Sequence, residues 1–126
     1  MEILKIIVLS LSSLLLIFVG ISRLTHPIKT YFKNSGIKIE NDTNLLNEIR
    51  GISSVMLCGG IITCLGIFHK NLTFTSLIVA ALIFLGFAIG RIISLSVDGK
   101  PNRQIVQGVL FEIIFGLACV IFLIIN

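Results

Sequence analysis

Two charged residues interrupt the most apolar stretches of this sequence. Arg91 lies within the apolar segment 72–97, and Glu112 lies within the apolar segment 105–125. A charged side chain at the centre of a membrane helix costs roughly 2.5–3.5 kcal/mol on insertion scales, so neither residue is expected to face lipid alone. An arginine beside a carboxylate can hold a polar ligand, or it can stabilise negative charge while the carboxylate moves a proton. The structural alternative is an ion pair that only fixes the register of two helices.

The two charges are predicted to lie at similar depths. Arg91 precedes Asp98 by seven residues, and Glu112 follows Asn102 by ten. At 1.5 Å per residue, these separations are about 10 and 15 Å from the same turn. Helices joined by so short a turn are antiparallel neighbours, so we expect Arg91 and Glu112 to lie within reach of each other. Glu48, near the start of another apolar segment, is the competing partner for Arg91.

Other polar residues are predicted to gather at the same membrane end, and the opposite end is predicted to be a sealed apolar region. The polar set at that end is Arg23, His26, Glu48, Arg50, Ser94, Asp98, Gln104 and Gln107. We therefore predict a polar mouth at one end of the protein. Its candidate ligand-binding residues are Glu48, Arg50, Arg91, Asp98 and Glu112.

The elements that position these residues are predicted to be membrane helices. The chain has 126 residues, of which 56% are hydrophobic and only 13% charged, whereas soluble domains usually carry about 25% charged residues. Four apolar spans, at about 3–21, 52–68, 72–97 and 105–125, are each about long enough to cross a hydrocarbon core of roughly 30 Å. The turns between the later spans are too short for parallel neighbours. The predicted fold is a single domain, 1–126: an all-α membrane protein built as an antiparallel four-transmembrane-helix bundle.

The first loop is the only sizeable segment outside the four spans. Thr25 and Pro27 are typical of a helix start, and Gly36 is typical of a helix stop. Between them, apolar and aromatic residues alternate with Lys29 and Lys33. This pattern favours a short interfacial helix, with a plain basic loop as the alternative.

The basic residues predict how the protein sits in its membrane. Lys5 and Lys70 fall on one side of the bundle. Seven fall on the other: Arg23, Lys29, Lys33, Lys38, Arg50, Lys100 and Arg103. Positive residues favour the cytoplasm, so the first and third loops are predicted to be cytoplasmic and both termini outside.

Small residues indicate where helices approach closely. Gly86, Gly90 and Ser94 form one stripe at a spacing of four, and Gly108, Glu112 and Gly116 form another. Small residues let membrane helices pack closely, and we expect these stripes to serve packing within the chain. Glu112 shares its stripe with two glycines and is therefore expected to point into the bundle.

Several function classes lack their sequence signals. No nucleotide-binding or hydrolase motif is present, and no nucleic-acid-binding motif accompanies the net charge of +4. Cys58, Cys64 and Cys119 form no Cys-x-x-Cys pair and are interpreted as small packed residues, and no metal or cofactor is predicted. The predicted partners are membrane lipids, together with a homo-oligomer or a larger membrane complex.

Four short pieces of sequence together resemble a known family. They are Glu48-Ile49-Arg50-Gly51, Gly59-Gly60, Gly86-Phe87-Ala88-Ile89-Gly90-Arg91 and Asp98-Gly99-Lys100-Pro101, with Glu112 beyond. Their set and order resemble domain-of-unknown-function family 4345, a family of small bacterial four-helix membrane proteins. The resemblance covers nearly the whole chain and implies four spans in a bacterial inner membrane. It supplies no established activity and therefore no catalytic residue.

The layout is also similar in architecture to the eicosanoid and glutathione membrane-enzyme superfamily. That superfamily has four helices and a polar site with arginine and glutamate on the cytoplasmic side. Glu48 and Arg50 are the local match to it, whereas its longer second-helix pattern is absent.

Three functions fit the sequence. The leading hypothesis is a non-enzymatic binding or accessory protein that holds a small polar ligand or lipid headgroup in the cytoplasmic-side mouth. The first alternative is a membrane-embedded enzyme that acts on a lipid-soluble substrate, with Glu112 or Glu48 as the acid or base. The second is a small proton-coupled transporter that works as an oligomer, which the sealed apolar end disfavours.

Overall fold

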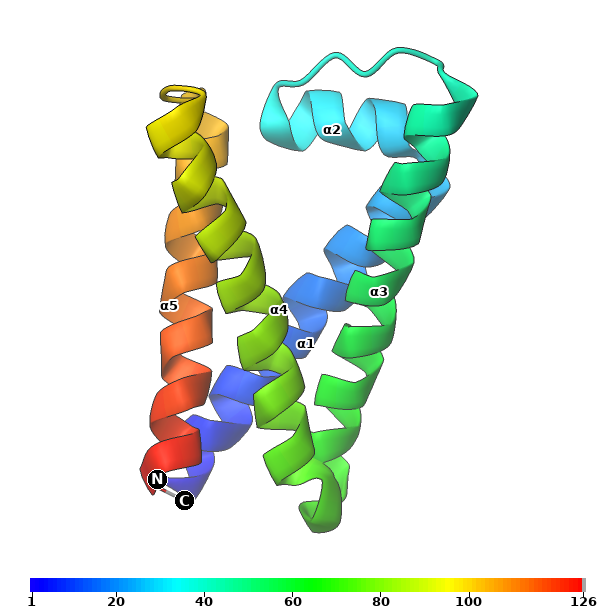
Figure 1. Ribbon diagram of the computed structural model, residues 1–126. Coiled ribbons are helices and arrows are strands. Elements are labelled where there is room, and N and C mark those ends of the chain that lie inside the picture. The colour runs from blue at the N-terminus through cyan, green and yellow to red at the C-terminus, as the bar shows by residue number, and fades with distance from the viewer. Residues whose placement is uncertain (126) are drawn as a thin grey trace.

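The computed structural model describes residues 1–125, and this part of the chain is helical with short connections. Four long helices, α1 (Glu2–Thr25), α3 (Thr43–Phe68), α4 (Lys70–Val97) and α5 (Arg103–Ile125), are long and apolar enough to cross a membrane. They run alternately up and down, with both ends of the chain at one end of the bundle (Figure 1). The predicted antiparallel four-helix membrane fold is therefore confirmed. Each helix extends beyond the apolar span predicted for it, α3 by nine residues at its start and the others by a few.

The fifth helix, α2 (Pro27–Ser35), is the short helix predicted in the first loop. It lies across the end of the bundle opposite the chain termini, at a steep angle to the four long helices (Figure 1). Pro27 occupies its first turn, and Gly36 ends it with a φ of 67°, a left-handed conformation that glycine adopts without a steric penalty. The helix start and stop predicted from the sequence are thus both confirmed.

Side-chain and backbone hydrogen bonds tie α2 to its neighbours. Thr30 Oγ1 donates to the carbonyl of Ser22 on α1 at 2.9 Å. At the other end of α2, Asn102 Nδ2 donates to the carbonyl of Ser35 at 2.8 Å, and Asn102 Oδ1 accepts from the backbone N–H of Ile105 at 3.0 Å. Asn102 therefore caps α5 and holds the end of α2 at the same time.

The long helices form two closely packed pairs, α1 with α3 and α4 with α5, which are joined through α3 and α4. Glycines allow the close approach within each pair. A Cβ atom at Gly20 would lie 2.8 Å from the backbone nitrogen of Leu57, and one at Gly116 would lie 2.5 Å from a methyl of Leu85. The two pairs lie closer together toward the chain termini and further apart toward α2 (Figure 1).

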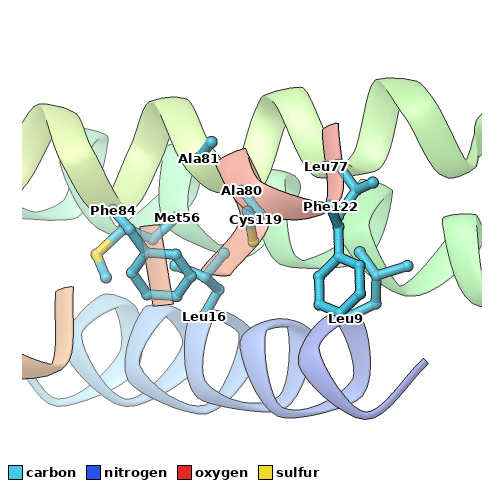
Figure 2. Close-up of a cluster of buried hydrophobic side chains, with 9 residues drawn as sticks. All are labelled: Leu9, Leu16, Met56, Leu77, Ala80, Ala81, Phe84, Cys119 and Phe122. Atoms are coloured by element: carbon cyan, nitrogen blue, oxygen red, sulfur yellow. The ribbon is translucent and has the colours of Figure 1, made fainter. Parts of the chain in front are cut away.

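The core lies where the two pairs meet. All four long helices contribute to it, as Figure 2 shows, and its buried members are Leu9, Leu16, Met56, Leu77, Ala80, Ala81, Phe84, Cys119 and Phe122. Phe84 of α4 stacks on Phe115 of α5 with ring centroids 5.6 Å apart. Cys119 is fully buried and lies 4.0 Å from Ser12 Oγ, which fits the packing role predicted for it.

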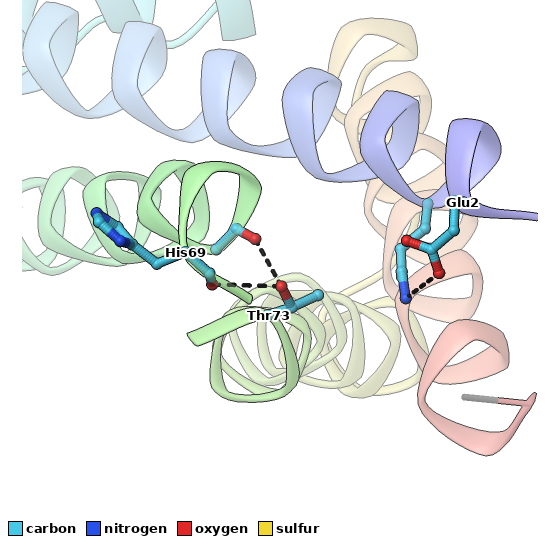
Figure 3. A network of polar contacts seen from close by, with 5 residues as sticks. Glu2, His69 and Thr73 are labelled. Atoms are coloured by element: carbon cyan, nitrogen blue, oxygen red, sulfur yellow. Dashed lines mark hydrogen bonds and ion pairs between the residues drawn. The ribbon is translucent and has the colours of Figure 1, made fainter. Parts of the chain in front are cut away.

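The end that carries the chain termini is less apolar than the sequence predicted. Lys5 is buried in the bundle, with 8% of its surface exposed, and it pairs with Glu2 at 2.9 Å. Nearby, Thr73 Oγ1 donates to the carbonyls of Gly66 at 2.7 Å and His69 at 3.4 Å (Figure 3). The predicted apolar end therefore also holds one ion pair, in which the largely buried Lys5 extends along α1 to the exposed Glu2.

Candidate functional site: a charged pocket between the two helix pairs

A cavity of about 130 Å³ lies between the two helix pairs, where it borders the apolar core at Leu16, Met56 and Phe84. Its walls come from all four long helices. Three charged residues line it, Arg23 of α1, Arg91 of α4 and Glu112 of α5. The remaining lining residues are Leu15, Leu16, Val19, Met56, Phe84, Phe87, Gly108 and Phe111. We call this cavity the charged pocket.

Arg91 and Glu112 meet in the charged pocket, as their predicted depths required. Arg91 Nη1 lies 3.4 Å from Glu112 Oε1, and the two side chains are 30% and 13% exposed. The contact is an ion pair without an aligned hydrogen bond, because Glu112 Oε1 has no hydrogen-bond partner among residues 1–125. Arg91 also lies 5.9 Å from the centre of the Phe87 ring. One carboxylate oxygen in the pocket is thus free to accept a hydrogen bond.

Gly108 makes room for this pair. A Cβ atom at Gly108 would lie 3.2 Å from Arg91 Nη1, which is tighter than ordinary contact. Gly116, one turn beyond Glu112 on the same stripe, is the position where α5 approaches Leu85 of α4. The predicted packing role of the Gly108–Gly116 stripe therefore agrees with the structure, and Glu112 points inward as expected.

Gly86 and Gly90, on the other stripe, lie on an exposed part of α4. A Cβ atom at either position would meet no atom of residues 1–125 within 4 Å. These two glycines therefore do not bring α4 close to another helix of this chain. They face away because α4 uses the opposite side, with Ala80, Ala81 and Ala88, for its buried contacts.

Arg23 is the third charge of the charged pocket, and it is not one of the five predicted binding residues. It lies in the last turn of α1, and its guanidinium carbon is 4.4 Å from the centre of the Tyr31 ring on α2. Its Nε atom is buried and has no hydrogen-bond partner within residues 1–125. The sequence offers only a partial signal, the aromatic Tyr31 in the following short helix, which allows a contact with Arg23 but does not show that Arg23 turns inward.

The other three predicted binding residues lie outside the charged pocket. Glu48 is exposed on α3. Arg50 Nη1 donates a hydrogen bond to the carbonyl of Leu24, near the end of α1. Asp98 is exposed at the end of α4, where it accepts a hydrogen bond from Ser94 Oγ at 2.7 Å. Of the five predicted residues, the structure brings together only Arg91 and Glu112.

The comparison with protein families agrees with this architecture. Residues 3–123 match the family described as a domain of unknown function, DUF4345. The chain belongs to this family. The DUF4345 resemblance deduced from the four short sequence pieces is therefore confirmed. No curated protein and no solved structure matches the chain.

Membership in DUF4345 and the four long apolar helices together make this chain an integral membrane protein of unknown activity. The family description names no reaction, and the charges of the pocket determine what it can bind. Two guanidinium groups and one carboxylate give the pocket a formal charge of +1. Such a site can bind an anion, since guanidinium groups donate charged hydrogen bonds to carboxylate and phosphate oxygens. Within residues 1–125, no cluster of three His, Cys, Asp or Glu side chains could hold a metal ion.

Proposed function

We propose that this DUF4345 protein is a non-enzymatic membrane binding protein that holds a small anionic group in its charged pocket. The group belongs to a lipid headgroup or to a small polar molecule. We further propose that it acts in a bacterial inner membrane, with α2 and the α4–α5 turn on the cytoplasmic side.

One observation carries the proposal: the pocket holds one more cation than it needs for an internal ion pair. Arg91 has Glu112 as its counter-charge at 3.4 Å. Arg23 has the Tyr31 ring on one side, but its buried Nε donor has no hydrogen-bond acceptor within residues 1–125. An arginine does not lose its proton in a protein, so it must find an anion or water at this depth. A bound anionic group supplies both the missing charge and the missing acceptor.

The size of the cavity limits the bound group. Common sites for drug-sized molecules occupy roughly 300–1,000 Å³, whereas the charged pocket measures about 130 Å³. The pocket therefore fits a small headgroup, such as a carboxylate or phosphate, better than a sugar or a nucleotide. Its other walls are leucine, methionine and phenylalanine side chains, which fit the apolar part of a ligand next to the anion.

Native mass spectrometry after gentle extraction from the membrane tests this proposal. The wild-type protein should carry the additional mass of a bound anion. Arg23→Gln should lose this mass, because the substitution removes the unpaired Nε donor and the positive charge of Arg23. Arg103→Gln is the matched control, since Arg103 is exposed at the start of α5 and does not line the charged pocket. A wild-type protein that carries no bound anion would reject the proposal.

An enzymatic role is the second candidate, and the free acceptor on Glu112 favours it. A carboxylate that is not locked to an arginine by an aligned hydrogen bond can take a proton from a bound substrate. Arg91 and Arg23 would then stabilise the negative charge that develops on that substrate. Under this candidate, Glu112→Gln abolishes the cellular phenotype of the protein while the bound mass persists. If Glu112→Gln leaves that phenotype intact, Glu112 is not an acid or base.

A further inference from the structure

A second cavity of about 400 Å³ lies on the outer surface of the protein, where α1 and α5 face the membrane. We call it the lipid-facing groove. Its lining is apolar and consists of Leu11, Leu14, Leu15, Phe18, Phe111 and Phe115. Two of these residues, Leu15 and Phe111, also line the charged pocket. The groove and the pocket therefore share a wall and are next to each other.

The groove exists because α1 and α5 are not a packed pair. Each is held by another helix, α1 by α3 and α5 by α4, and the two touch each other at few positions. The glycines that allow close approach lie elsewhere, at Gly20 toward α3 and at Gly116 toward α4. On the groove side, bulky rings such as Phe18 and Phe111 stand between the helices, and both are more than half exposed.

At the α2 end of the charged pocket, the Tyr31 ring lies 4.4 Å from the Arg23 guanidinium. Hydrogen bonds from Thr30 to Ser22 and from Asn102 to Ser35 hold α2 in this position. The α1–α5 side of the pocket instead borders the apolar lipid-facing groove.

On these grounds, and resting on the function proposed above, we infer that the ligand is a single-chain amphiphile with a small monoanionic headgroup. A long-chain carboxylate is the simplest example. Its headgroup lies between Arg23 and Arg91, and its chain leaves through the lipid-facing groove between α1 and α5. The charge of the pocket fits one negative charge, since two arginines and one glutamate sum to +1. Along α1 the groove runs from Leu11 to Phe18, roughly 10 Å, which accommodates several methylene groups of one chain.

Photolabelling with a chosen probe tests where the chain lies. The probe is dodecanoate with a diazirine at the end of its chain, added to the full-length protein in phosphatidylcholine nanodiscs. Its methyl ester, which has the same chain and no charge, is the matched ligand control. After irradiation, labels on Leu11 and Leu14, at the far end of the groove from Arg23, are compared with labels on Leu82, which is 70% exposed on α4 and outside the groove.

The expected result is a groove-to-Leu82 labelling ratio about tenfold higher for the carboxylate than for its ester. Tenfold corresponds to the strength of one charged hydrogen bond, about 1.4 kcal/mol. Arg23→Gln should remove this excess and Arg23→Lys should restore part of it, whereas Arg103→Gln should leave it unchanged. The same ratio for both probes in the wild type overturns the inference.

The fluorescence of Tyr31 separates this inference from the proposed function. Tyr31 is the only tyrosine and the chain has no tryptophan, so in phosphatidylcholine vesicles, which contain no scaffold protein, its emission reports on the group next to Arg23. If dodecanoate but not the ester changes this emission while labels spread evenly over the lipid-facing surface, the anion binds and the chain route is wrong. If neither the emission nor the labelling responds to the charge, both the inference and the proposed function fail.

Discussion

Removing one charge of the Arg91–Glu112 pair should have different effects at its two ends. The pair is 3.4 Å apart, and Arg23 lines the same pocket. Glu112→Gln leaves two arginines in the charged pocket without any carboxylate. Arg91→Gln leaves one arginine and one glutamate, which can still neutralise each other. We therefore predict that Glu112→Gln lowers the free energy of unfolding more than Arg91→Gln does.

The sizes follow from the cost of placing charges in a membrane helix. Each buried charge costs roughly 2.5–3.5 kcal/mol. Arg91→Gln removes the partner of Glu112 but also the cost of burying the Arg91 charge, so it should destabilise the protein by about 1 kcal/mol or less. Glu112→Gln leaves uncompensated charge and should destabilise by about 2–3 kcal/mol. The lower values apply if water reaches Arg91, whose side chain is 30% exposed. The double variant should reveal a coupling of about 1–2 kcal/mol between the two residues.

The assay is unfolding in dodecyl maltoside micelles with increasing sodium dodecyl sulfate, followed by circular dichroism. Arg103→Gln is the control for removing an exposed arginine. The exchange variant, Arg91→Glu with Glu112→Arg, should regain part of the stability that either reversal loses alone. Single effects that add within about 0.5 kcal/mol, or a larger loss for Arg91→Gln than for Glu112→Gln, would refute this description of the pocket.

Three further predictions concern the framework of the pocket. Gly20→Ala should lower the free energy of unfolding by about 1–3 kcal/mol, since its Cβ would meet the α3 backbone at 2.8 Å. Gly86→Ala, where a Cβ meets no atom of residues 1–125 within 4 Å, should be neutral or stabilising by up to about 1 kcal/mol, and equal losses for the two variants would contradict this prediction. Asn102→Ala removes the α5 cap and one of two side-chain bonds to the end of α2, the other being the bond from Gln104 to Lys33, so hydrogen exchange should quicken at the end of α2 and the start of α5 and stay unchanged in the middle of α3. Protection of both ends as in the wild type would reject this linking role of Asn102. In a cysteine-free background in whole cells, Lys70→Cys should react with an impermeant thiol reagent and Lys100→Cys only after permeabilisation, and the reverse pattern would invert the proposed orientation.

The sequence was sufficient to predict the Arg91–Glu112 contact because one short turn fixes it. Residues that are 7 and 10 positions from the same turn must lie at similar depths on adjacent helices. The short helix α2 was predictable for a similar local reason, since Pro27 and Gly36 mark its ends. Both predictions depend on local chain geometry and need no knowledge of how distant helices pack.

The sequence was not sufficient to predict which way Glu48 and Arg50 face. On α3, the buried residues include Ile49, Ser53 and Met56, which follow the helical period of 3.6. Glu48 and Arg50 flank Ile49 at about 100° on either side, so both leave the buried face. In a soluble helix, polar residues would have marked the outer face. Glu48 and Arg50 lie just before the apolar part of α3, where a charged side chain can face either the water or the bundle, so the sequence alone does not choose between the two directions.

Arg23 could not be assigned to the pocket for a different reason. Its place in the last turn of α1 is that of an interfacial residue, where arginine commonly extends toward water. It turns inward here because α2 follows at once and brings Tyr31 against its guanidinium. Its inward position therefore depends on the path of α2 across the bundle, which a reading of separate helices does not include.

The presence of Arg23 in the charged pocket bears on whether the pocket is only structural. A pair that fixes the register of α4 and α5 requires one cation and one anion, and Arg91 with Glu112 supplies both. A third charge on α1 adds insertion cost without completing that pair. It also holds α1 to α2 through Tyr31, which accounts for one face of the guanidinium but leaves its buried Nε unfilled. A binding role and a register-fixing role therefore predict different results for Arg23→Gln. If the pocket binds an anion, this substitution removes the bound anion, whereas if the pocket only fixes the register of α4 and α5, the Arg91–Glu112 pair remains and no ligand is lost.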